Sequence, residues 1–209
     1  MTINKKQIAF NHTLRTQKPQ YIVIHDTGNT RAGANAESHY NYFNSADRQA
    51  SADFFVDDKQ VLQINDYAKY YSWHCGDGSG KYGITNSNSI GIEICVNSDG
   101  NYEKAFANAV GLTRHLMGEL GIPADRVVRH YDASRKNCPA SMAANNWARW
   151  SEFKAQLATN PDTPSAWAKT AWDWATLAKI TDGTNPQGTI TREQVATMLH
   201  RFAERAGLL

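Results

Sequence analysis

Three residues of the types that bind transition metals stand at or near the ends of apolar segments. His25 ends the run YIVIH, His130 ends RVVRH, and Cys138 follows eight positions later in RHYDASRKNCP. Two imidazoles and one thiolate leave the fourth position of a tetrahedral zinc ion open to water. The pattern therefore predicts a catalytic Zn²⁺ site, with two core histidines and a buried thiol as the alternative.

The surrounding segments must bring these three side chains together. The apolar segments before His25 and His130 are expected to form strands of one sheet. Because ligand sites of α/β sheets lie where the strands end, we expect His25 and His130 to converge beyond two neighbouring strands. Cys138 precedes Pro139, a residue suited to the first position of a helix. We predict a helix over residues 139–157, whose free N–H groups and dipole would stabilise the thiolate of Cys138.

Short apolar runs alternate with helical patterns over the first three quarters of the chain. Strand-like runs occur at 21–25, 53–58, 61–65, 89–97 and 126–130, and helical patterns at 35–44, 101–120 and 139–157. This alternation indicates an α/β fold, with a central mixed sheet flanked by helices. We predict a catalytic domain over 1–158, a proline-containing linker over 159–165, and a small all-α helix pair over 166–209.

Composition narrows the classes of function. The chain has 209 residues, 41% of them hydrophobic and 20% charged, with a formal net charge of +2. Such a small charge, without basic runs, argues against nucleic-acid binding. The sequence has neither a membrane-spanning stretch nor a signal-peptide pattern, so we expect synthesis in the cytoplasm and no membrane insertion. Three sparse cysteines indicate reduced thiols.

Four segments together resemble the type 2 N-acetylmuramoyl-L-alanine amidases, zinc hydrolases found among phage endolysins and bacterial autolysins. They are YIVIHDTG, WHCGDG, NSIGIEI and RHYDASRKNCP, and the resemblance covers about residues 19–157. It implies that His25, His130 and Cys138 bind zinc. It also implies cleavage of the amide between N-acetylmuramic acid and the L-alanine of the peptidoglycan stem peptide.

Amide hydrolysis also requires a general base and positive charge near the developing oxyanion. Glu93 is the one carboxylate within SIGIEICV, and it resembles the glutamate that is taken to be the base in the bacterial and phage members of the family. The alternative is that Glu93 is an outward-facing strand residue without a catalytic role. Lys136, two residues before Cys138, is predicted to stabilise the oxyanion, although a solvated loop lysine would have the same pattern.

Three further residues are predicted to contact substrate. Some relatives have a tyrosine where this chain has Ala52 or Asp53, which shifts the role of base to Glu93 and leaves Asp53 as a supporting or substrate-contacting carboxylate. In the family a loop like SWHCGDG borders the substrate groove. His74 would then hydrogen-bond the muropeptide and Trp73 would anchor the loop or stack on sugar, with a structural loop histidine as the alternative. A thiol hydrolase using Cys75 is disfavoured, because adjacent residues rarely place a thiolate against the neighbouring ring.

The tail segment KITDGTNPQGTITREQVATMLHRF resembles a single S-layer homology motif, which implies binding to a bacterial wall polymer. Helices that pack on the catalytic domain are the alternative. Because one such motif is small, useful affinity for the wall would come either from the added grip of the catalytic groove or from self-association of the chain into a homo-oligomer through the tail.

The leading hypothesis is a phage-type endolysin that acts on peptidoglycan after release from the cytoplasm. A non-catalytic peptidoglycan-binding module is disfavoured by Cys138. A cytoplasmic amidase that recycles muropeptides is disfavoured by the tail, since soluble fragments require no wall anchor.

Overall fold

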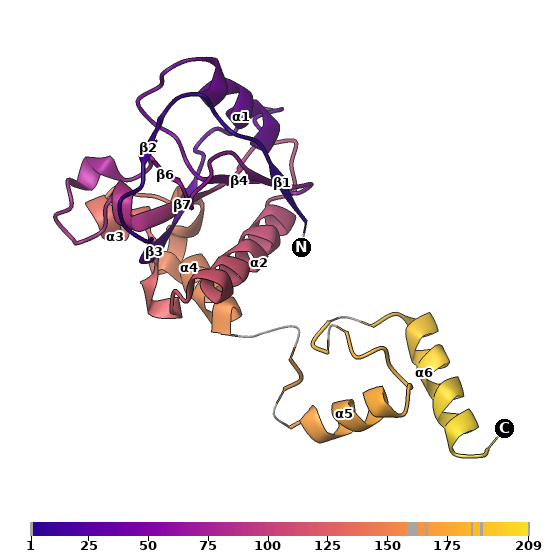
Figure 1. Cartoon of the computed structure of the whole chain (residues 1–209). Coiled ribbons are helices and arrows are strands. Elements are labelled where there is room, and N and C mark those ends of the chain that lie inside the picture. Colours follow the sequence, from indigo (N-terminus) through magenta and orange to yellow (C-terminus); the bar gives the residue numbers. More distant parts are fainter. Residues whose placement is uncertain (1, 159–162, 166, 185, 189, 209) are drawn as a thin grey trace. The chain divides into compact units, whose positions relative to one another are not determined.

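A six-stranded mixed sheet forms the centre of the first part of the chain (Figure 1). Its strands, in spatial order, are β1 (Ile3–Lys5), β5 (Val61–Gln63), β4 (Phe54–Val56), β7 (Ser89–Ile94), β3 (Tyr21–Asp26) and β8 (Val127–Arg129). Neighbouring strands are parallel except for the antiparallel pair β4 and β5. The predicted α/β class with a mixed sheet is confirmed.

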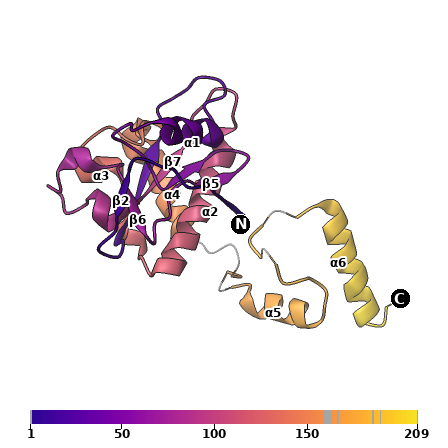
Figure 2. The same cartoon turned by 45° about the horizontal axis from the view of Figure 1, so that its top comes forward.

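Helices cover both faces of this sheet (Figure 2). On one face α2 (Tyr102–Leu120) and α4 (Ala144–Ala158) pack against the largest hydrophobic cluster, which includes Ile24, Phe54 and Ile92. On the other face α1 (Ala36–Ser45) packs over a second cluster around Phe55. The short helix α3 (His130–Ser134) follows β8 directly and contributes Ala133 to a third cluster.

Shorter elements complete this part of the chain. They are the antiparallel pair β2 (His12–Leu14) and β6 (Tyr70–Ser72), and the 3₁₀ turns η1 (Gly76–Gly78), η2 (Asn86–Asn88), η3 (Ala124–Arg126) and η4 (Ala140–Met142). No helix in the described part of the chain is long and apolar enough to cross a membrane.

Strand alternation decides which side chains reach the site. Successive residues of a strand point to opposite faces, so His25 lies on the face of β3 opposite to Ile24. Glu93 has the same relation to Ile92 on β7, and His25 is its register partner. Phe55 of β4 is the register partner of Glu93 on the other side. One row across the sheet therefore carries an aromatic ring, a carboxylate and an imidazole away from the main core.

The predicted helix start at Pro139 is wrong. Pro139 follows a cis peptide bond and precedes η4, and α4 begins only at Ala144. Asn145 and Trp147 within α4 have positive φ angles, so regular α-helix begins still later. Cys138 thus lacks an α-helical N-terminus, and the predicted dipole stabilisation of its thiolate does not apply.

The structure, a computed structural model, describes residues 2–158, 163–165, 167–184, 186–188 and 190–208. The chain divides into two compact units, 1–158 and 159–209. Much of the predicted linker at 159–165 lies outside the described residues, as does residue 166, and these domain bounds stay a prediction. The second unit contains α5 (Lys169–Leu177) and α6 (Arg192–Arg205), and Ile180 is the one buried hydrophobic side chain among its described residues.

Candidate metal centre

His25, His130 and Cys138 come together as predicted. Each offers one ligand atom, and these atoms all lie within 4.8 Å of one another. The Cys138 Sγ is 3.8 Å from the Nδ1 of His25. Bonds of about 2.0 to 2.3 Å around a tetrahedral zinc ion would place ligand atoms about 3.3 to 3.8 Å apart. All three side chains are buried, so their ligand atoms are largely shielded from bulk water.

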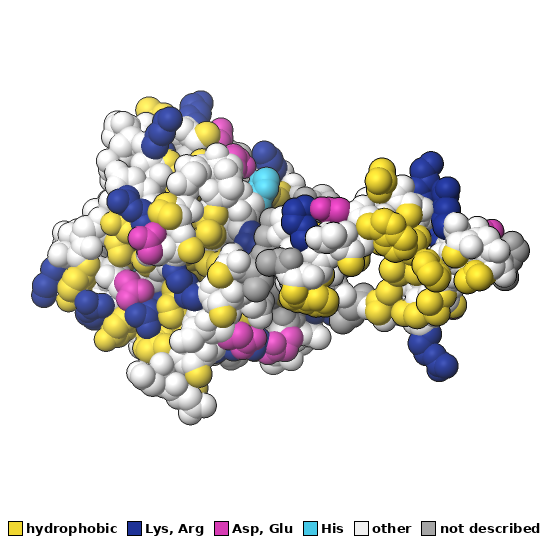
Figure 3. Space-filling model, turned by 90° about the horizontal axis from the view of Figure 1, so that it is seen from below, with side chains coloured by type: hydrophobic (Ala, Val, Ile, Leu, Met, Phe, Trp, Pro, Cys, Tyr) yellow, Lys and Arg dark blue, Asp and Glu magenta, His cyan; other side chains and the backbone are white. Residues whose placement is uncertain are grey.

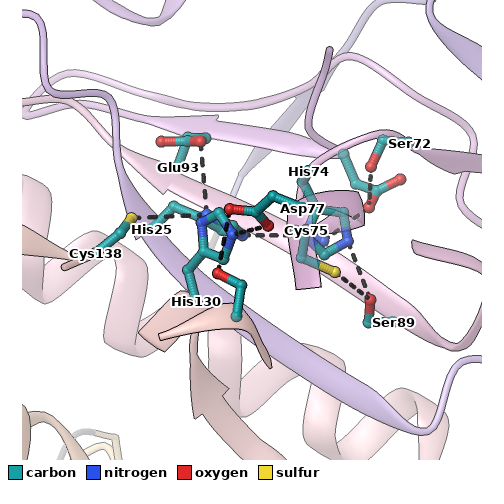
Figure 4. Close-up of polar contacts among 12 residues, drawn as sticks. His25, Ser72, His74, Cys75, Asp77, Ser89, Glu93, His130 and Cys138 are labelled. Carbon is teal, nitrogen blue, oxygen red and sulfur yellow. Dashed lines mark hydrogen bonds and ion pairs between the residues drawn. The ribbon is translucent and has the colours of Figure 1, made fainter. Parts of the chain in front are cut away.

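The outer nitrogens of both imidazoles are hydrogen-bonded (Figure 4). The Nε2 of His25 lies 3.0 Å from the Nδ1 of His74, and the Nε2 of His130 lies 2.7 Å from the Oδ1 of Asp77. Cys138 and Glu93 approach His25 from its Nδ1 side. Both ligand histidines thus turn Nδ1 toward the cluster and Nε2 away from it.

The Nδ1 of His130 is buried and has no hydrogen-bond partner among the described residues. A buried polar nitrogen without a partner is costly, whereas a metal ion would use its lone pair. This unpartnered nitrogen, together with the His and Cys donor types, shows that the residues present fit a zinc ion.

The two imidazoles of the cluster are in the neutral form that can bind a metal cation, whereas the thiol is not yet ionised. Burial lowers the pKa of His25 well below its usual value, with further lowering by the nearby His74 and His130. Burial also lowers the pKa of His130, although Asp77 opposes this effect. Both imidazoles are therefore neutral at pH 7, the form that binds metals. Burial raises the pKa of the Cys138 thiol to about 12, so metal binding must displace its proton.

Glu93 lies next to the ligand set. Its Oε1 is 3.8 Å from the Nδ1 of His25, and its Oε2 is buried without a hydrogen-bond partner among the described residues. Burial raises the pKa of Glu93 well above its ordinary value, Asp26 raises it further, and Lys136 lowers it. A carboxylate with a raised pKa and a free oxygen beside a metal site has the properties of a general base.

A cleft of about 360 Å³ opens onto the cluster. Its lining includes the three ligands, Glu93 and the exposed residue Lys136. Lys136 also borders an adjoining hollow of about 290 Å³ with Gln49 and Asn86. A cationic side chain at the mouth of the cleft could meet negative charge that develops on a substrate carbonyl.

The loop of residues 73–78, which follows β6 and includes η1, borders both hollows. Trp73 lines both of them, and its Nε1 donates to the Oγ1 of Thr13 at 2.9 Å. His74 also borders them, but it is buried, and its Nε2 lies 3.1 Å from the Oγ of Ser89. Burial lowers the pKa of His74 to about 3, so the ring is neutral.

The structure does not bring Asp53 to the cleft. Asp53 is fully buried, and its carboxylate accepts hydrogen bonds from Asn65, Ser72 and the backbone N–H of Gly91 at 2.7 to 2.8 Å. Burial raises its pKa, and these donors oppose the rise. Its position supports a structural role that ties β4 to β7, and the expected contact with substrate has no support here.

Sequence reasoning missed Asp77. Its Oδ2 accepts from the Oγ of Ser134 at 3.1 Å while Oδ1 holds His130. Partial burial acts to raise the pKa of Asp77, but hydrogen bonds from His130 and Ser134 bring the net pKa below its usual value. The available signal was a carboxylate three residues after His74 in a glycine-rich loop.

A His₂Cys cluster beside a half-buried carboxylate, at the end of parallel strands, defines a candidate metallohydrolase. A profile of the N-acetylmuramoyl-L-alanine amidase family matches residues 15–141. The chain therefore belongs to this family.

Individual relatives agree with this assignment. The chain is 38% identical over 167 residues to the N-acetylmuramoyl-L-alanine amidase CwlH of Bacillus subtilis (strain 168), covering 78% of this chain and 64% of CwlH. It is 41% identical over 142 residues to XlyA of the same organism, covering 66% of this chain and 44% of XlyA. This chain thus spans less than two thirds of the length of either relative.

Solved structures are also similar to the first unit. The catalytic domain of XlyA matches with a TM-score of 0.67 at 37% identity, covering 76% of this chain and all (100%) of that domain. PlyL matches with a TM-score of 0.66 at 35% identity, covering 76% of this chain and 98% of PlyL.

Proposed function

We propose that this protein is a zinc-dependent peptidoglycan hydrolase that cleaves the amide between N-acetylmuramic acid and L-alanine. The observation that carries the proposal is the buried cluster of His25, His130 and Cys138 with Glu93 beside it, in a chain of the amidase family. A non-catalytic binding module would have no need for a ligand set with an adjacent base.

Zinc is the metal that the donors favour. Thiolate and imidazole together suit zinc, whereas magnesium and calcium take oxygen ligands. The Nδ1 atoms of His25 and His130 and the Sγ of Cys138 would hold the ion. When bound there, zinc supplies Lewis-acid polarisation of a carbonyl and a water molecule of lowered pKa.

The side chains around the cleft would perform the remaining steps. Glu93 accepts the proton of the attacking water at its unpartnered Oε2 and then delivers it to the amide nitrogen that leaves as the L-alanine amine. Lys136 contributes positive charge near the carbonyl oxygen of the lactyl group as that oxygen becomes negative. The cleft binds the stem peptide and sugar, with Trp73 at its border.

The direct test combines metal analysis with product identification. The purified full-length protein should contain about one zinc per chain and should release free L-alanine amino groups from purified cell walls. New reducing sugars should not appear, because the glycan bonds stay intact. A protein that binds zinc but releases reducing ends instead would be a glycosidase, and one that binds walls without releasing either group would be a binding module.

We further propose that the second unit binds a bacterial wall polymer. Its described residues expose much apolar surface, including Trp167 (90% exposed), Leu177 (86%) and Leu199 (62%), and Figure 3 shows hydrophobic side chains gathered in this part of the chain. Aromatic and aliphatic surface of this kind is typical of binding sites. Self-association of several tails would raise the affinity of a small unit for a repetitive wall.

The proposed amidase site and the proposed wall-binding tail together support an endolysin that is made in the cytoplasm and reaches the wall after release. The chain is 40% identical, over 75% of its length, to a solved mutant endolysin from Bacillus subtilis. A wall-binding tail suits an enzyme that attacks intact walls better than one that recycles soluble fragments. Location is tested by fractionating producing cells before and after lysis.

A further inference from the structure

Two side chains of the loop 73–78 contact the two ligand histidines without being ligands themselves (Figure 4). We propose that His74 and Asp77 are positioning residues, which fix the tautomer and ring orientation of His25 and His130 so that both present Nδ1 to the metal. The inference rests on the proposed zinc site, and it replaces the expected contact of His74 with substrate.

The His74 arm is determined by a chain of hydrogen bonds. The hydroxyl of Ser89 donates to the carbonyl oxygen of Thr85, so its oxygen is free to accept from the Nε2–H of His74. A neutral His74 protonated at Nε2 has an acceptor at Nδ1. The Nε2 of His25, 3.0 Å away, must therefore carry a hydrogen and donate it. This leaves the lone pair of His25 on Nδ1, which faces Cys138.

The Asp77 arm reaches the same result by a shorter route. An ionised carboxylate only accepts hydrogen bonds, so the Nε2 of His130 must donate to the Oδ1 of Asp77 at 2.7 Å. The lone pair of His130 then lies on its buried, unpartnered Nδ1. Ser134 donates to the other carboxylate oxygen and fixes its rotation. Carboxylates paired with ligand histidines in this way raise the basicity of the ligand.

Close packing holds the loop against the sheet. A Cβ atom at Gly91 of β7 would lie 2.6 Å from the Cγ of His74, so the imidazole rests directly on the backbone of that strand. A Cβ at Gly78 would lie 2.1 Å from the carbonyl oxygen of Ala133 in α3. The Oδ1 of Asn86 accepts from the backbone N–H groups of His74 and Cys75. These contacts hold His74 and Asp77 in place beside the two ligand histidines.

The same contacts argue against a substrate-binding role for His74. Both of its ring nitrogens are engaged, one by His25 and one by Ser89, and only 9% of the residue is exposed. A substrate group could hydrogen-bond this ring only by breaking one of these contacts. The two roles therefore differ in what a substitution should change: zinc affinity for a positioning residue, and KM for a substrate contact.

The first experiment compares His74→Asn with His74→Leu in the full-length protein. Asparagine can place an acceptor oxygen where Nδ1 lies, whereas leucine offers a similar volume without an acceptor. Zinc affinity is measured by competition with a chromophoric chelator, and thermal unfolding checks the fold. We expect His74→Leu to weaken zinc binding by about tenfold to hundredfold and His74→Asn to restore much of the loss. Wild-type zinc affinity with a raised KM in His74→Leu would overturn the proposal.

The second experiment avoids a buried substitution. Asp77 is partly exposed, so Asp77→Ala should fold normally and weaken zinc binding by about tenfold or more. Glu119→Ala is the matched control, since Glu119 lies 3.2 Å from the exposed His115 in an ordinary surface pair. Unchanged zinc affinity in Asp77→Ala would refute the role of Asp77.

Imidazole ¹⁵N chemical shifts of the metal-free protein separate this inference from the proposed function. We expect His25 and His130 of the wild-type protein to carry hydrogen on Nε2, and His25 of His74→Leu to populate both tautomers. A wild-type protein that shows these tautomers but neither binds zinc nor cleaves walls would refute the proposed function and leave the tautomer assignment intact. Mixed tautomers at both histidines in the wild-type protein would refute the positioning role.

Discussion

His25 and Glu93 are register partners on the neighbouring parallel strands β3 and β7, and the Oε1 of Glu93 lies 3.8 Å from the Nδ1 of His25. The sheet itself therefore sets the distance between the proposed metal ligand His25 and the proposed base Glu93. Because both residues sit on regular strands, this distance depends on backbone pairing rather than on a loop. Because Glu93 is not one of the proposed ligands, a substitution of Glu93 can remove the base and leave the metal site intact.

We predict that Glu93→Gln keeps its zinc and its fold but loses turnover by about 10² to 10⁴, as expected when a positioned general base is removed. Glutamine preserves the volume and one acceptor oxygen but cannot take up a proton. Zinc content and kcat on purified walls are measured on the same preparation. Glu119→Gln, on the exposed side of α2, is the control. Loss of zinc in proportion to activity would instead make Glu93 a support for the metal.

The rate should depend on the ionisation of Glu93. Burial and Asp26 raise its pKa, and a base must be ionised, so kcat/KM falls as pH decreases through that raised pKa. The positive charge of Lys136 lowers this pKa. We therefore predict that Lys136→Met moves the acidic limb of the profile to higher pH and also lowers the maximal rate.

Asp26→Asn tests the link between the pKa of Glu93 and the acidic limb in the opposite direction. Asp26 raises the pKa of Glu93, so its neutralisation should move the acidic limb to lower pH. Zinc content is measured at each pH, so that loss of metal is distinguished from protonation of the base. Limbs that coincide in the wild-type protein and both variants would assign the limb to another group.

The three ligands should be equivalent in a metal-content assay. We predict that His25→Ala, His130→Ala and Cys138→Ser each lose most of their zinc and all measurable hydrolysis, because two protein donors are too few to hold an open-site metal. Cys75→Ser and Cys95→Ser, which alter the other two free cysteines, should keep zinc and activity. A Cys138→Ser variant with normal zinc content would remove Cys138 from the ligand set.

The sequence predicted the sheet and the ligands because both follow from local pattern. Apolar runs indicate strands, and residues just beyond parallel strands meet at one edge, which is why His25 and His130 converge. The contacts of His74 and Asp77 could not be read in this way. They depend on how the loop 73–78 crosses between β7 and α3, where glycines at 78 and 91 allow close approach.

The environments of Cys138 and Asp53 were also beyond local pattern. Pro139 is compatible with a helix start, but here it precedes a 3₁₀ turn, so the expected stabilisation of the thiolate is absent. Asp53 directly precedes the short strand β4 and was expected to be a supporting or substrate-contacting carboxylate. In the structure its buried carboxylate accepts hydrogen bonds from Asn65, Ser72 and the backbone of Gly91. Burial of a polar group becomes visible only when distant segments are placed around it.

The two units of the chain allow catalysis and wall binding to be tested separately. The first unit ends at Ala158, with α4, and the solved catalytic domain of XlyA matches 76% of this chain over its entire length. A protein of residues 1–158 should therefore fold and retain the complete ligand cluster.

We predict that residues 1–158 cleave soluble muropeptides at a near-normal rate but sediment poorly with cell walls and lyse whole cells slowly. The physical reason is the loss of exposed tail residues such as Trp167 and Leu199, whose contact with the wall would add to the grip of the catalytic cleft.

In the chain of residues 1–209, Trp167→Ala should weaken sedimentation with walls while leaving the rate on soluble fragments unchanged. Sedimentation velocity of both lengths tests self-association, which should require the tail. Equal lysis of whole cells by the two lengths would argue against wall binding by the second unit, and loss of activity on soluble fragments would show that the tail supports the fold of the first.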